Sequence, residues 1–179
     1  MKPFVWLLLL LAADDFSSIQ RKMDDIVKEH VKHGGRVFMS HSELDAYLRA
    51  QALAIAPKAV HDTKIELGEN SGTASAKVNF LELNKARGAQ SNWMMEKMLD
   101  GERLVKVSVH IQCDHGKARV NVDRVEINGA GIQGAPLDFL IQNYVVPQFP
   151  TAKVDQWFTL DHHMDRIDVH PAGASVLIR

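Results

Sequence analysis

The sequence predicts a single α+β domain that is built on an antiparallel sheet and has helices at its N-terminus. Three observations predict this fold class. Apolar residues recur every three or four positions before residue 57, every second position over most of the chain from residue 64, and again with helical spacing after Pro136. The longer period is typical of an amphipathic helix, and the period of two is typical of a half-buried strand. Short turns between the segments with a period of two favour antiparallel hairpins.

The composition is that of an ordinary globular protein, with 179 residues of which 46% are hydrophobic and 24% are charged. A chain of this length buries about two-thirds of its unfolded surface, so it needs no disulfide or structural metal for stability. Its single cysteine, Cys113, agrees with this. The formal net charge is −1, which gives no general field to attract nucleic acid or an acidic membrane surface. We therefore expect no nucleic-acid partner.

The N-terminus has the pattern of an export signal. Lys2 precedes an uninterrupted apolar run of ten residues, 4–13, and Asp14 and Asp15 follow it. A helix needs about 20 residues to cross a bilayer, so we expect no retained transmembrane helix. Residues 1–13 are predicted to be a signal peptide and residues 14–179 a single domain that is extracytoplasmic, either periplasmic or secreted. The alternative is an uncleaved hydrophobic N-terminus, because a leucine occupies the −3 position of either possible cleavage site.

Two helices are predicted before the strands begin. Residues 16–31 have apolar residues at helical spacing, and Gly34 and Gly35 suit the end of that helix. After a short extended stretch, Ser40 and Glu43 have the spacing of a capping box, which predicts the start of a second helix. Pro57 closes that region.

Strands are predicted from the mid-sixties onward. A hairpin turns at Asn70-Ser71-Gly72, and residues 84–92 read as a polar loop before a short helical turn at 93–99. Apolar and polar side chains alternate without interruption over residues 105–113, which predicts a strand with one buried apolar face and one solvent-facing polar face.

The chain then turns at 114–117, and the alternation of the following strand slips by one near Asp123 and Arg124, which predicts a β-bulge. A last hairpin turns at Pro171-Ala172-Gly173.

A glycine-rich segment, Gly129 to Gly134, matches G-x-G-x-x-G between a strand and a helix. In a dinucleotide-binding motif the helix begins within the glycines, whereas Pro136 here predicts a helix start after the last one. Only 45 residues follow Gly134, too few to complete a doubly wound fold. We interpret the segment as a strand-to-helix connection and expect no cofactor.

Histidines form two close groupings in the sequence, His30 with His33 and His162 with His163. Neither has the spacing of a zinc hydrolase motif, so we expect solvated histidines at a helix end and in a polar loop, and no metal. A surface metal contact that involves Asp165 is left as an alternative. Cys113 alternates in phase with apolar residues, so it is not expected to be a nucleophile.

Apolar and aromatic side chains gather near the helix that begins at Pro136. Packing is the common role of such side chains, but they could also line the mouth of a hydrophobic groove. The candidate ligand-binding residues are Leu137, Leu140, Ile141, Tyr144, Phe149, Trp157 and Phe158.

The layout resembles uncharacterised exported bacterial proteins of an acidobacterial type. The motifs that carry this resemblance are Ser42-Glu43-Leu44-Asp45-Ala46-Tyr47-Leu48, Pro147-Gln148-Phe149-Pro150, Phe158-Thr159-Leu160 and Ile167-Asp168-Val169-His170-Pro171. More remotely, the chain is similar to the YpmS-like envelope families, which are like half of a TULIP-type lipid-binding domain. The resemblance implies a curved antiparallel sheet wrapped around the helix at 137–146, and a lipid or another apolar molecule as ligand.

These observations lead to a non-enzymatic extracytoplasmic protein that binds a lipid-like or other apolar ligand in the cell envelope. An envelope module that docks a partner protein, without a small-molecule ligand, is the first alternative. A metal-assisted enzyme around His162, His163 and Asp165 is the second.

Overall fold

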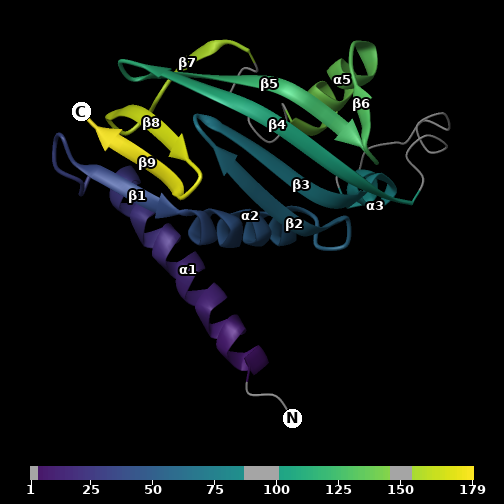
Figure 1. Cartoon of the computed structure of the whole chain (residues 1–179), viewed down its shortest axis with the longest axis horizontal. Coiled ribbons are helices and arrows are strands. Elements are labelled where there is room, and N and C mark those ends of the chain that lie inside the picture. Colours follow the sequence, from purple (N-terminus) through teal and green to yellow (C-terminus); the bar gives the residue numbers. More distant parts are fainter. Residues whose placement is uncertain (1–3, 87–100, 146–154) are drawn as a thin grey trace.

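The computed structural model describes residues 4–86, 101–145 and 155–179, and for residues 4–13, 55, 86, 144 and 145 it describes the backbone alone. The fold is α+β with antiparallel sheets and a few helices, as the sequence predicts (Figure 1). One sheet has three strands in the order β1-β9-β8. The other has the order β2-β3-β4-β5-β6, with β7 also paired to β5.

The helices and strands follow one another along the chain with these bounds. The N-terminal elements are α1 (Phe4–Val27), β1 (Arg36–Ser40) and α2 (His41–Ile55). The central elements are β2 (Val60–Gly68), β3 (Ser71–Asn79), α3 (Phe80–Ala86), β4 (Glu102–Asp114), β5 (Lys117–Ile127) and β6 (Ala130–Ile132). The C-terminal elements are α5 (Ala135–Leu140), a π-turn (Ile141–Val145), β7 (Trp157–Thr159), β8 (Met164–His170) and β9 (Gly173–Ile178).

The capping box at the start of α2 is confirmed. The Glu43 backbone N–H donates to Ser40 Oγ at 3.3 Å, and the Ser40 backbone N–H donates to Glu43 Oε2 at 2.7 Å. The first helix differs from expectation at its end, because α1 stops at Val27, before the glycine pair. Glu29 has a φ of 57°, a left-handed conformation that turns the chain away from the helix axis.

The three-stranded sheet and the first helix enclose the larger of the two hydrophobic clusters found among the described residues. Its buried members are Ile19, Ile26, Met39, Val176 and Ile178. They come from α1, β1 and β9, which meet at one side of the molecule (Figure 1). Long-range contact between the two ends of the chain therefore builds this core, and we refer to it as the terminal core.

The large sheet is formed by the predicted hairpins. In the register of β4 and β5, Val105 lies opposite Ile127 and Val109 lies opposite Val122. The register shifts between Ser108 and Val109, where Asp123 is left without an opposing residue. This confirms the β-bulge predicted near Asp123, which restores the inward direction of the apolar side chains that follow it.

The edge of the large sheet at β2 is covered by α2. The Ile65 backbone N–H donates to Asp45 Oδ1 at 3.2 Å, and His41 Nε2 lies 2.9 Å from the Ile65 carbonyl oxygen. Side chains of the helix thus satisfy backbone groups that an edge strand would otherwise offer to another chain.

In two regions between the strands, the secondary structure differs from the prediction. The chain is helical at 84–86, in α3, where the sequence predicts the start of a polar loop. The rest of that loop and the helical turn predicted at 93–99 lie outside the described residues. The helix predicted after Pro136 is present, but after Leu140 it widens into a π-turn.

The glycine-rich segment forms no dinucleotide-binding turn. Gly129 has a φ of 81° in the turn after β5, and the next residues form β6, which pairs antiparallel with β5. A dinucleotide-binding motif needs a parallel crossover at this place. Among the described residues, no helix is long and apolar enough to cross a membrane.

Candidate functional site

One face of the large sheet is apolar along its two longest strands, and we call it the valine face. Its residues are Val105, Val107, Val109 and Ile111 on β4, and Val120, Val122, Val125 and Ile127 on β5. Cross-strand register places the two sets opposite each other, so their side chains share one side of the sheet. The opposite side is polar, as the 2.9 Å hydrogen bond between Thr73 Oγ1 and Ser108 Oγ shows.

The valine face is less buried than the terminal core. Of its eight side chains only Val125 is buried, and the others are half-buried. Ile19 in the terminal core is 0% exposed. At one end of the face, Leu140 packs on the cluster around Val78 and Phe80. At the other end, β8 contacts β4 and β5. Between these two ends, most side chains of the face are half-buried.

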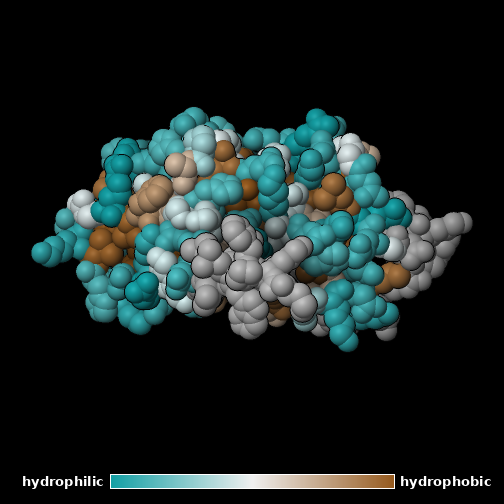
Figure 2. Space-filling model, turned by 60° about the horizontal axis from the view of Figure 1, so that its bottom comes forward, coloured by the Kyte–Doolittle hydropathy of each residue, from teal (hydrophilic) through white to brown (hydrophobic). Residues whose placement is uncertain are grey.

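The side of the molecule that carries α1 and α2 has a different distribution of apolar surface. Where described residues form that side, brown patches are separated by hydrophilic residues (Figure 2). Scattered apolar residues of this kind are normal on a globular protein.

The candidate ligand-binding residues of the sequence fall into two groups. Leu140 packs on the cluster of Val78 and Phe80, as Ile127 does, whereas Phe158 lies opposite Ala118 on β5, and Trp157, which is 47% exposed, lies opposite Arg119. The nine steps from Ala118 to Ile127 span about 30 Å of strand, so the two groups lie toward opposite ends of β5.

Leu137 and Ile141 are half-buried on the helical segment beside Leu140. The side chain of Tyr144 and all of Phe149 lie outside the described residues.

An arginine lies at one end of the valine face. Arg103 precedes Val105 by two residues and pairs in register with the buried Val78, so its side chain lies on the apolar side. Its Nε atom is buried and has no hydrogen-bond partner. An unsatisfied buried N–H costs about 1–3 kcal/mol. The sequence carries a signal for this residue, since Arg103 continues the alternation of the valines toward the N-terminus.

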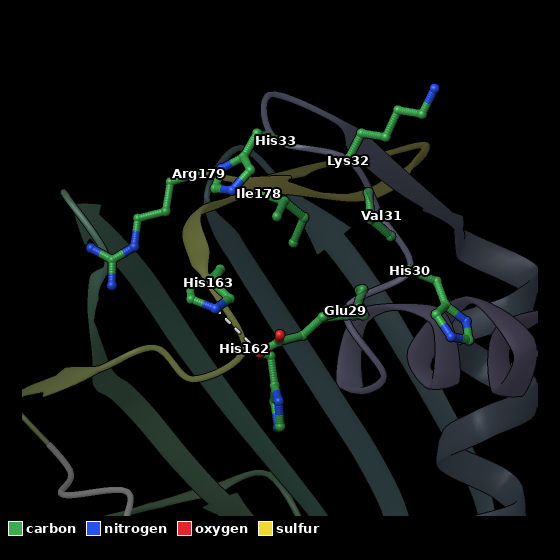
Figure 3. A pocket seen from close by; sticks show the side chains of 10 residues that line it. Glu29, His30, Val31, Lys32, His33, His162, His163, Ile178 and Arg179 are labelled. Carbon is green, nitrogen blue, oxygen red and sulfur yellow. Dashed lines mark ion pairs between the residues drawn. The ribbon is translucent and has the colours of Figure 1, made fainter.

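A second site is a pocket of about 290 Å³ between the end of α1, the loop before β8 and the end of β9. It brings together both histidine pairs of the sequence. His163 Nε2 lies 3.2 Å from Glu29 Oε1, and the His33 and His163 rings are 6.4 Å apart. Glu29, His33 and His163 lie near one another, whereas the ammonium of Lys32 extends outward (Figure 3). We refer to it as the histidine pocket.

The histidine pocket lacks the geometry of a metal centre. Within the described part of the chain, no three His, Cys, Asp or Glu residues are placed to hold a metal ion. Asp165, which belongs to the metal-assisted alternative, does not line the pocket. The loop conformation is turn-like, since His162 and His163 have φ values of 52° and 57°. The sequence contained both pairs, but their meeting depends on long-range packing that no local pattern encodes.

Cys113 lies half-buried on β4, in phase with the valine face. Burial raises the pKa of its thiol above the usual value. A thiol of this kind is a poor nucleophile at neutral pH because it carries little thiolate.

Comparisons of the chain with protein-family models, with curated proteins and with solved structures find no match. The likeness to envelope lipid-binding proteins therefore stays a prediction from the sequence.

Proposed function

We propose that this chain is a non-enzymatic, extracytoplasmic protein that binds a lipid-like or other apolar ligand against the valine face. One observation carries the proposal: the valine face is continuous across β4 and β5, yet seven of its eight side chains are only half-buried. Apolar area that folding leaves open is available to a ligand, and its burial contributes about 25 cal/mol per Å².

The proposal includes the finer shape that the resemblance implies. The large sheet curves around α5 and its π-turn, and the ligand lies between this helical segment and the valine face. Leu140 supports this position, since it packs against the cluster of Val78 and Phe80, as Val105 and Ile127 do. Leu137 and Ile141 extend the same helical surface.

Export is the second part of the proposal. It rests on residues 1–13, whose charged start and short apolar run are typical of a signal peptide. An envelope location would give the protein access to lipid and to apolar molecules that enter the cell.

The direct test is extraction of the purified protein with organic solvent, followed by mass spectrometry, together with titration of a fluorescent fatty acid. We expect a co-purified apolar molecule and saturable binding. A double variant, Val109→Thr with Val122→Thr, keeps the shape of one cross-strand pair but makes it polar. We expect it to weaken binding roughly tenfold.

The matched control lies on the opposite side of the same sheet. Thr73→Val with Ser108→Ala removes the cross-strand hydrogen bond there and should leave the affinity unchanged. Absence of both extracted lipid and fatty-acid binding would refute the proposal. Equal weakening by the two double variants would show that binding does not occur on the valine face.

A docking function is the second candidate, and the edge strand β1 favours it. β1 is the outer strand of the three-stranded sheet, and Phe38 on it is 46% exposed. A partner strand could add to such an edge. A photo-crosslinking residue at position 38, expressed in cells, should then trap one defined partner, whereas the same residue at exposed Lys64 should not. Equal labelling at both positions would exclude the β1 edge as a docking site.

A further inference from the structure

Arg103 is the one cationic side chain that the register places on the apolar side of β4. Val78 is its partner on β3 and is buried, and Val105 follows it on the same side. From Arg103 to Ile111, β4 spans about 26 Å. A guanidinium thus stands at one end of a long apolar surface.

Among the described residues, the guanidinium of Arg103 has no partner. Several other arginines have one, for example Arg49 with Asp45 at 2.6 Å and Arg166 with Asp168 at 2.9 Å. Arg103 forms no ion pair or hydrogen bond with any residue that the structure describes, and its Nε atom is buried. A partly buried guanidinium is normally paired, because its donors lose water on burial.

We infer that the ligand of the valine face is a single-chain amphiphile with an anionic headgroup, and that Arg103 binds this headgroup. The inference rests on the proposed function. The apolar chain of the ligand would pack on Val105, Val107 and Val109. Its anionic headgroup would be the ion-pair partner of Arg103. The planar guanidinium can donate two parallel hydrogen bonds to a carboxylate or a phosphate oxygen pair.

The structure supplies a matched control in Arg119. Its Nε atom is also buried and has no hydrogen-bond partner. Its register partners are Gln112 and Trp157, and it alternates with Ala118 and Val120, so its side chain lies on the polar side of the sheet. Within the part of the chain that the structure describes, an arginine with an unpaired Nε atom is thus present on both sides of the sheet, but only Arg103 adjoins the valine face.

The experiment compares three ligands of equal chain length: dodecanoate, dodecyl phosphate and dodecanol. Each displaces a fluorescent fatty acid from the wild-type protein, from Arg103→Met and from Arg119→Met at pH 7.5. We expect the wild type to bind at least one of the two anions roughly tenfold more tightly than the alcohol. Arg103→Met should bind anion and alcohol with equal affinity, and Arg119→Met should keep the wild-type preference.

The outcomes separate the inference from the proposed function. If dodecanol binds as tightly as both anions to the wild type, the headgroup role is wrong, although an apolar ligand still binds. If Arg119→Met also loses the preference, the effect is not local to the valine face, and the inference fails. If none of the ligands binds, the proposed function fails and the inference fails with it. Should Arg103→Met not fold, Arg103→Gln replaces it. The ratio of the wild-type affinities for the anions and for dodecanol still decides whether a headgroup is recognised.

Discussion

The terminal core and the valine face are built from the same kind of side chain but differ in how completely they are covered. In the terminal core, side chains from α1, β1 and β9 meet and exclude water, as Ile19 shows. On the valine face, equally apolar strands keep most of their side chains half-buried. The first region is explained by stability alone. The second region retains apolar surface that folding does not bury. We propose that the ligand binds to this surface.

The largest expected effect comes from the terminal core. Ile19→Ala should lower the free energy of unfolding by about 4 kcal/mol, because it removes buried methylenes and leaves a cavity. Val109→Ala on the valine face should cost only about 1 kcal/mol, since that side chain is half-buried. Denaturant titration measures both, and equal losses would remove the distinction between the two regions.

The ion pair that joins α1 to α2 should have the next largest effect. Lys22 Nζ donates to Glu43 at 2.7 Å, and Glu43 is 4% exposed. Burial alone would raise the pKa of Glu43, but hydrogen bonds from Lys22, Ser18 and the Ser40 backbone outweigh it and lower the pKa from 4.5 to about 2.

Because the pKa is lower in the folded state, this stabilisation is complete above pH 4.5 and is lost as the pH falls toward 2. Glu43→Gln should therefore cost about 3 kcal/mol at pH 7 and should flatten the acid limb of the stability curve. Glu66→Gln alters an exposed pair with Lys64 and should change little. An unchanged acid limb in Glu43→Gln would contradict the role of this ion pair.

A smaller effect tests the direction of the valine face. Val107→Asp should cost about 2 kcal/mol, because the carboxylate enters an apolar but half-open surface. The neighbouring Lys106→Asp should cost less than about 1 kcal/mol, since position 106 is exposed and the new aspartate would face the like charges of Glu126 and Glu66 in solvent. Melting temperatures report the difference, and similar values for the two variants would place the register in doubt.

Local pattern predicted the elements better than it predicted the sites. The alternation from Val105 to Cys113 predicted β4, and the slip near Asp123 predicted the bulge in β5, because backbone geometry alone relates period to structure. The same alternation occurs whether the apolar face of a strand is fully buried or partly exposed, so the half-burial of the valine face was not predictable.

The sites depend on contacts between distant parts of the chain. His33 and His163 meet only because α1 packs beside the C-terminal hairpin. Trp157 and Leu140 were grouped by nearness in sequence, yet the pairing of β7 with β5 separates them. Arg103 could have been identified from the sequence, because it is in phase with the valines of β4. It was missed because an arginine does not extend an apolar pattern.

Methyl NMR of the valine and isoleucine side chains during a titration with dodecanoate tests the central claim most directly. We predict that the signals of Val107, Val109 and Val122 shift and saturate, while those of Ile19, Val176 and Ile178 in the terminal core stay in place. Shifts confined to the terminal core, or none at saturating dodecanoate, would contradict the assignment of the valine face as the ligand-binding surface.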